Sequence, residues 1–78
     1  MKTTSYFDST RNRSDRLSIK EEWITYVIKN PERIQIQTDG RIRIWARINE
    51  AEGRYLRVVL LSDNETVHNA FFDRRFKP

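Results

Sequence analysis

Apolar and polar residues alternate through two stretches of the chain, residues 33–37 and 41–48, which an Asp-Gly turn at 38–40 separates. A period of two is the repeat of a β-strand with one buried face, and Asp-Gly between two such stretches is typical of a hairpin. Two further stretches with strand composition, residues 55–61 and 66–72, follow after turn residues. Strands joined by short turns run antiparallel, because parallel strands need long crossover connections. The sequence therefore predicts a four-stranded antiparallel meander.

A helical repeat precedes these strands. Its apolar residues recur every three or four positions; they are Ile19, Trp23, Ile24, Val27 and Ile28. Ser18 and Glu21 have the spacing of a capping box at the start, and Pro31 ends the pattern because proline excludes its predecessor from the α region. We expect a helix over residues 19–29. The polar segment that begins at Asp8 is expected to form either a short helix capped by Asp8 or a loop.

Turn lengths set the register of the first three strands. The loop after the second strand places Ile48 opposite Arg54. The turn before it, with Gly40 in the left-handed conformation, places Ile36 opposite Ile42. In this register the apolar side chains of three strands share one face, and a slip of one residue would turn all of them to the other face. We expect the helix to cover this apolar face.

The opposite face of the same strands is rich in arginine and aromatic residues. Its members are Arg43, Trp45, Arg47, Tyr55, Arg57 and Val59. A two-residue turn at 63–64 would place Val59 opposite His68 and so bring His68 onto this face. The same register turns Asn69 towards the core, and a shift of one residue there would instead move His68 inward.

The charge of the chain favours a polyanionic partner. Fifteen basic residues oppose eleven acidic ones, which gives a net charge of +4 and a pI near 9.9. Eleven of the fifteen are arginine, which grips phosphate through paired hydrogen bonds and stacks on aromatic rings. Arginine can also serve only to keep a surface soluble, but a pI this high favours binding to a polyanion.

Composition excludes several classes of protein. The chain has no cysteine, so disulfides and thiolate metal sites are absent, and His68 alone does not make a zinc site. No stretch approaches the roughly 20 apolar residues that a membrane helix needs, and the first residues lead into no apolar run typical of a secretory signal. We therefore expect one domain over residues 1–78, in the cytoplasm, with no metal, cofactor or membrane partner.

Arginine interleaved with aromatic residues on a sheet is a common surface for single-stranded nucleic acid. Arg43 and Arg47 would follow the phosphate backbone. Trp45 and Tyr55 would stack on bases, at about 1–3 kcal/mol per base. The alternative is that cross-strand pairs of arginine and aromatic residues stabilise a solvent-facing sheet without any ligand.

His68 is the only histidine of the chain, and histidine is the side chain that titrates unperturbed near neutral pH. Beside several arginines it could transfer a proton while a ribose 2′-hydroxyl attacks the adjacent phosphate. The arginines would neutralise the charge that develops in the transition state. The alternative is a half-buried histidine that makes one structural hydrogen bond.

Several short motifs are shared with a family of small bacterial proteins. They are an arginine-rich start, Trp23-Ile24 in a helix that ends at Asn30-Pro31, Asp39-Gly40-Arg41, Leu56-Arg57-Val58-Val59 and Thr66-Val67-His68-Asn69-Ala70. In this layout, from about Arg11 to Phe76, the chain resembles the BrnT-like toxins and, more distantly, the RelE/ParE toxins. The resemblance implies a helix packed on an antiparallel sheet, a ribonuclease activity that arrests translation, and a cognate antitoxin protein that covers the site.

The resemblance also implies roles for particular residues. Arg57, on the central strand, and Arg74, just past the last strand, match positions at which such toxins carry phosphate-binding residues. One departure concerns the proton chemistry, because relatives often have a histidine in the first strand and residues 5–8 contain none. Proton transfer then falls to His68, to Tyr6 or to an arginine, unless the activity has been lost.

We therefore predict an α+β fold in which an N-terminal helix, with or without a second one, packs on a four-stranded antiparallel meander sheet. The predicted function is that of an RNA-cleaving, metal-independent toxin of a type II toxin–antitoxin pair, acting on free or ribosome-bound RNA. The predicted catalytic residues are His68, Arg57 and Arg74, and the predicted RNA-binding residues are Arg13, Arg16, Arg43, Trp45, Arg47 and Tyr55. The alternative is a non-catalytic basic module that docks nucleic acid or an acidic partner protein.

Overall fold

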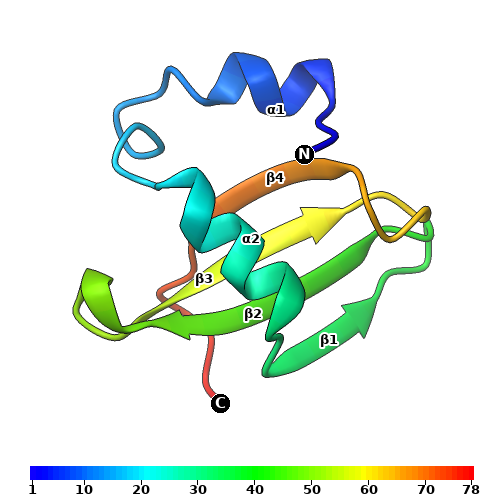
Figure 1. The fold of residues 1–78 in the computed structure, drawn as a ribbon. Helices are drawn as coiled ribbons and strands as arrows, with labels where there is room; N and C mark the ends of the chain where they lie inside the picture. The colour runs from blue at the N-terminus through cyan, green and yellow to red at the C-terminus, as the bar shows by residue number, and fades with distance from the viewer.

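The computed structural model describes residues 1–78 and contains one antiparallel sheet with the strand order β1-β2-β3-β4 (Figure 1). The strands are β1 Arg33–Ile36, β2 Ile42–Ile48, β3 Arg54–Leu60 and β4 Val67–Phe72, and a short 3-10 helix, Asn49–Ala51, joins β2 to β3. Helix α2, Glu21–Lys29, crosses one face of the sheet, and helix α1, Ser5–Thr10, lies beside β4 (Figure 1). The predicted fold class and meander order are confirmed.

Helix α2 forms where the apolar repeat predicts it. Ile24 and Val27 are fully buried against the sheet, while Glu21 at the start and Lys29 at the end suit the helix dipole. The predicted capping box is wrong, because Lys20 is the N-cap residue and no side chain caps the helix. Ser18 lies two residues too early, so its hydroxyl does not reach the first free amides.

Helix α1 begins earlier than the polar segment indicated. Thr4 is its N-cap residue, and the Thr4 hydroxyl oxygen accepts a hydrogen bond from the Phe7 amide at 3.1 Å. Asp8 therefore lies inside the first turn instead of capping the helix, and Phe7 enters the hydrophobic core. The expected short helix is thus present, but with other bounds and another cap, and the apolar period does not reveal these bounds because α1 contributes a single large apolar residue to the core.

The segment before α1 attaches to the outer edge of β4. The Thr4 amide donates to the Val67 carbonyl at 3.1 Å, and the Val67 amide donates to the Lys2 carbonyl at 2.8 Å. These bonds form an isolated parallel bridge between Thr3 and Val67, outside the antiparallel sheet. One edge of the sheet is thus covered by the chain itself.

The register of the first three strands is the predicted one. Ile36 faces Ile42 and Ile48 faces Arg54, with every intermediate pair in step. Gly40 has φ +88°, the left-handed conformation that the turn requires. The apolar side chains of β2 and β3 meet α2 in one core; its buried residues are Phe7, Ile19, Ile24, Val27, Ile44, Ala46, Ile48, Ala51, Leu56, Val58, Leu60, Val67 and Ala70.

Helix α2 does not cover the whole apolar face. It packs on β2 and β3, and Ile34 and Ile36 of β1 remain 58% and 72% exposed. The expectation that the helix covers this side is therefore wrong for β1. A nine-residue helix presents too narrow a stripe to span a four-stranded sheet.

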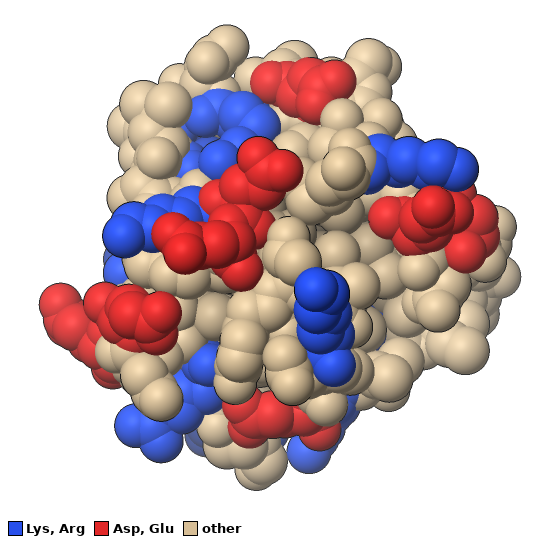
Figure 2. Space-filling view, viewed as in Figure 1, with Lys and Arg blue, Asp and Glu red and all other residues tan.

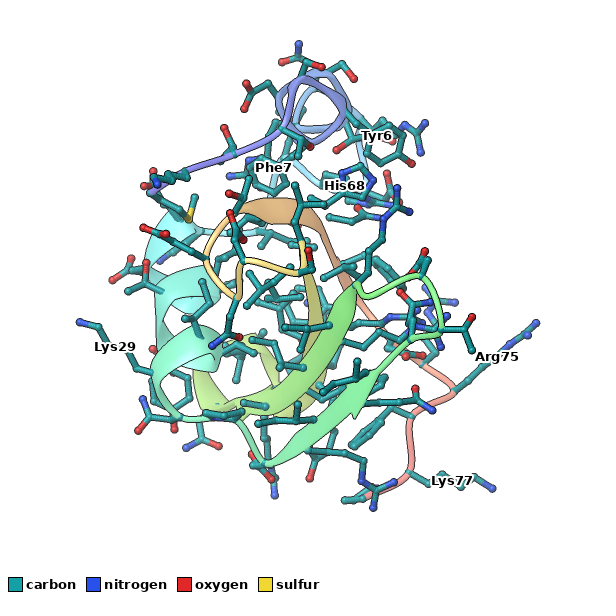
Figure 3. The ribbon with its side chains drawn as sticks, turned by 90° about the vertical axis from the view of Figure 1, so that its right-hand side faces the viewer. Tyr6, Phe7, Lys29, His68, Arg75 and Lys77 are labelled. Carbon is teal, nitrogen blue, oxygen red and sulfur yellow. The ribbon has the colours of Figure 1, made fainter.

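The segment after β4 leaves the sheet, as predicted, and folds along the face opposite α2. Figure 3 shows α2 and this tail, with Arg75 and Lys77 on it, on opposite sides of the sheet. Neither helix has the length and apolar character that a membrane crossing requires.

Candidate functional site

A β-bulge in β4 decides which side chains reach the arginine-rich face. The pairing shifts between Val59 and Leu60, so that Asn69 faces Val59 and Phe71 faces Arg57. The predicted Val59–His68 pair is wrong by one residue. The shift has a clear physical reason, because the predicted register would have buried Asn69, whereas the bulge turns it outward and places Ala70 in the core.

A hollow of about 380 Å³ opens on this face between β4, β3 and the β1–β2 turn. Its lining residues are Tyr6, Gln37, Arg41, Arg57, Val59, His68, Asn69 and Phe71. The hollow unites the predicted catalytic pair Arg57 and His68 with three polar residues that sequence reasoning did not assign to the site: Gln37, Arg41 and Asn69. The signal for Asn69 was its awkward position in the predicted register. Gln37 and Arg41 flank a turn and carried no such signal.

His68 is held at the rim of the hollow by two contacts from the N-terminal segment. Its Nδ1 lies 3.0 Å from the Thr4 hydroxyl oxygen, and its ring stacks on Tyr6 with centroids 4.8 Å apart. Figure 3 shows Tyr6 and His68 side by side next to α1. Burial and then the positive charge of Arg41 lower the pKa of His68 from 6.5. The imidazole is therefore neutral at pH 7, the form that accepts a proton.

Arg57, on β3, lines the hollow. Its guanidinium carbon lies 5.6 Å from the centre of the Trp45 ring and 5.1 Å from that of Phe71, so the two rings fix its position. The Nε atom is buried and has no hydrogen-bond partner. Burial and the neighbouring Arg43 lower the pKa of Arg57, and the Asp73 carboxylate opposes this shift. Arg57 is a partly exposed cation in a polar hollow, and such a group is suited to binding an anion.

Asp73 holds Arg57 from the tail side. Its Oδ2 lies 3.7 Å from Nη1 of Arg57 and accepts a hydrogen bond from the Trp45 indole at 3.0 Å. Its Oδ1 accepts from the Arg75 amide at 3.1 Å. Burial opposes the ionisation of Asp73. The hydrogen bonds from Trp45 and Arg75 and the charge of Arg57 nevertheless keep the pKa of Asp73 below its ordinary value. Asp73 remains charged near neutral pH and compensates part of the charge of Arg57.

The tail also closes the predicted base-stacking surface. Phe76 stacks on Trp45 with ring centroids 4.9 Å apart and an interplanar angle of 17°, and it contacts Tyr55 at the same centroid distance. Trp45 is only 5% exposed as a result. The prediction that Trp45 is exposed on this face is wrong, because the Phe76 ring covers it. Nothing in the two-residue period indicated that Phe76 would return to the sheet.

Arg16 contacts two of the residues that line the hollow, Asn69 and Phe71. It is buried, its Nη1 donates to the Asn69 side-chain oxygen at 2.6 Å, and its guanidinium lies over Phe71. Its burial and its bond to Asn69 leave little of the Arg16 guanidinium exposed for the predicted RNA contact. Asn69 lines the hollow, and its side-chain oxygen is engaged by Arg16 and by the Ala70 amide.

The remaining predicted arginines lie outside the hollow. Arg43 contacts Gln35 at 3.4 Å and borders Arg57. Arg74 lines a separate depression next to Arg54. Arg47 lies against Gly53, where a Cβ atom would come within 2.7 Å of its Nη2. Arg13 is exposed on the loop after α1. The structure thus brings Arg57 and His68 together, but not Arg57 and Arg74.

The α2 side of the molecule carries both basic and acidic side chains. Figure 2 shows Lys and Arg interspersed with Asp and Glu on that face. No group of three or more His, Cys, Asp or Glu side chains is arranged to hold a metal ion.

The position of His68 predicts a pH dependence of stability. Because the pKa of His68 is lower in the folded protein than its ordinary value of 6.5, the unfolded chain binds more protons between these two pKa values. The free energy of unfolding should therefore fall as the pH drops below about 6.5. His68→Gln should remove this dependence, which urea unfolding at pH 7.5, 6.5, 6.0 and 5.5 would measure. An identical loss of stability in both proteins would contradict the prediction.

Comparisons with known proteins found no matching family, no matching curated protein and no matching solved structure. The resemblance to toxins drawn from short motifs therefore stays a prediction.

Proposed function

We propose that the protein is an RNA-cleaving toxin of a type II toxin–antitoxin pair, with the hollow as its active site. The observation that carries the proposal is the meeting of a neutral histidine with a half-buried arginine in one polar hollow. Perturbed titratable groups grouped in a cleft are typical of catalytic sites. This activity places the protein in the cytoplasm, where messenger RNA is translated.

The chemistry follows from the positions of three groups. Arg57 and Arg41 bind the non-bridging oxygens of an RNA phosphate at the hollow. When Nδ1 of His68 donates to Thr4, Nε2 is free to take the proton of the adjacent ribose 2′-hydroxyl. The 2′-oxygen then forms a bond to phosphorus, the bond to the 5′-oxygen breaks, and that oxygen takes a proton from water. The hydroxide that remains takes the proton from His68 and restores the neutral imidazole. The products are a 2′,3′-cyclic phosphate and a 5′-hydroxyl end, and no metal takes part.

The arginines of this face supply the transition-state stabilisation. Negative charge builds up on the phosphate oxygens during the attack, and a fixed guanidinium stabilises it without moving. Arg57 is held for this purpose by Trp45, Phe71 and Asp73. A small acidic antitoxin would complement the net charge of +4 and block the hollow.

The activity can be tested on the purified chain. We expect it to cut a single-stranded RNA in the presence of EDTA and to leave cyclic phosphate ends, which phosphatase treatment and gel mobility would identify. Induction in bacteria should arrest growth, and co-expression of a neighbouring gene for a small acidic protein should restore it. A folded protein that cuts neither free RNA nor RNA on translating ribosomes would contradict the proposal and leave the non-catalytic basic module.

RNA binding should depend steeply on salt. Each phosphate that an arginine neutralises releases counterions, so the logarithm of the binding constant should fall linearly with the logarithm of salt concentration. Arg41→Ala should reduce the slope by about 1. Lys29→Ala, which removes an exposed cation from the α2 side, is the matched control and should leave the slope unchanged. Fluorescence anisotropy of a labelled single-stranded RNA from 50 to 300 mM KCl would measure it, and salt-insensitive binding would contradict the expectation.

A further inference from the structure

The two edges of the sheet differ in whether another segment of the chain covers them. The β4 edge is covered by the residues before α1, through the Thr4–Val67 and Val67–Lys2 backbone bonds. The β1 edge has no neighbour, and all four residues of β1 are exposed. An open edge of a sheet is a template for pairing with another strand.

Backbone groups at two positions of β1 point away from the sheet. In an antiparallel pair alternate residues direct both their N–H and C=O groups to the partner strand. The Gln37 amide donates to the Arg41 carbonyl at 2.8 Å, which assigns Gln35 and Gln37 to the β2 side. Ile34 and Ile36 therefore present their N–H and C=O groups at the open edge.

The same two residues expose apolar side chains on the α2 side. Ile34 is 58% and Ile36 is 72% exposed, although both follow the alternation of the core face. Natural edge strands are usually protected on such a face by a charge, a proline or a bulge. Between Ile34 and Ile36, β1 has none of these devices.

We propose that β1 pairs with β1 of a second copy of this chain across a two-fold axis at Gln35. The segment Ile34-Gln35-Ile36 is a palindrome, so an antiparallel pairing centred on Gln35 places Ile34 opposite Ile36 of the partner subunit, twice. In each Ile34–Ile36 pair the two residues exchange two backbone hydrogen bonds, one in each direction between N–H and C=O. The outward-facing groups of both residues allow this. The pairing requires that both residues of each hydrogen-bonded pair direct their backbone groups to the open edge. Ile34 and Ile36 both do so, and both carry an isoleucine side chain.

The side chains of this pairing are compatible on both faces. On the α2 side the isoleucines of the two copies meet and leave water. On the other side Arg33 faces Gln37 of the partner subunit, so no like charges oppose each other. The two sheets become one continuous sheet, and neither Ile34 nor Ile36 lines the hollow. The contact is small, so we expect a dimer that forms over the micromolar range.

Sedimentation equilibrium of the full chain, over a concentration series, tests the proposal. The wild-type protein should shift from monomer to dimer, and Ile36→Lys should weaken dimerisation at least about tenfold, because each dimer loses two buried isoleucines and gains two cations. Leu17→Lys is the matched control, since Leu17 is similarly exposed at 66% but lies far from β1 in sequence and on the loop before α2. This control should dimerise like the wild type.

Hydrogen exchange gives a second measurement that does not depend on a variant. The amides of Ile34 and Ile36 should become protected as protein concentration rises, whereas those of Gln35 should not change. A wild-type chain that stays monomeric, or a dimer that the folded Ile36→Lys protein retains, would overturn the proposal. A monomeric chain whose β1 amides become protected only on adding a different protein would assign the edge to that partner instead.

Discussion

Replacing Arg57 with alanine is expected to lower the rate of RNA cleavage by about 10²–10³-fold, the usual cost of removing one fixed donor to a developing charge. The Arg57 guanidinium lies between Trp45 and Phe71 and is held by Asp73. No neighbouring cation can take over this position without moving. Arg57→Lys should recover only part of the activity, because a lysine lacks the planar fork.

Arg75→Ala is the matched control for this experiment. Arg75 is an exposed arginine of the tail, and its hydrogen bond to Asp73 is made by the backbone amide. The control removes the same charge from the chain and should leave the cleavage rate within about twofold of the wild type. Single-turnover cleavage of a labelled RNA would give both rates, and circular dichroism would confirm folding. Equal losses in the two variants would show that overall charge, and not the position of Arg57, governs the activity.

The second large effect is expected at His68. His68→Ala should lower the cleavage rate by about 10²–10⁴-fold if the imidazole takes the 2′-hydroxyl proton. Added imidazole should restore part of the activity of His68→Ala, which has space for it, and should not restore His68→Gln. The wild-type rate should rise with pH through a pKa below 6.5 and then level off, because burial and Arg41 hold the pKa of His68 below that value.

Folding must be followed in the same samples, since His68 also contacts Thr4 and Tyr6. His68→Gln can keep a hydrogen bond to Thr4 and separates loss of structure from loss of chemistry. If Arg57→Ala is inactive while His68→Ala keeps its full rate, the protein is a nuclease that works without histidine. That result would refute the role assigned to His68 and retain the one assigned to Arg57.

Local patterns predicted the parts of the fold that local forces determine. The apolar repeat located α2, and the alternation with its turn lengths gave the pairing from Ile36–Ile42 to Ile48–Arg54 residue by residue. Turn length and face alternation restrict each other so strongly in a hairpin that only one register buries the isoleucines. The placement of Arg57 on the face opposite α2 followed from the same restriction.

The parts that were predicted wrongly depend on contacts between distant segments. The bulge in β4 places Ala70 in the core and keeps Asn69 out of it, and the turn residues alone do not predict this bulge. Phe76 returns to Trp45 across the sheet, and Thr4 reaches His68 from the other end of the chain. A short helix such as α1 carries too few apolar residues for its period to be visible. The placement of Arg57 at the hollow was therefore predictable, but the side chains that the β4 bulge and the N-terminal segment bring beside it were not.

The bond between Thr4 and His68 joins residues 64 positions apart, and this separation affects the order in which the site can fold. A contact between residues so distant in sequence closes a long loop, so it costs chain entropy and forms late in folding. The Thr4–His68 contact should therefore form only after the sheet has brought the N-terminal segment beside β4. His68 would then be the last of the proposed catalytic groups to reach its position, after Arg57 on β3.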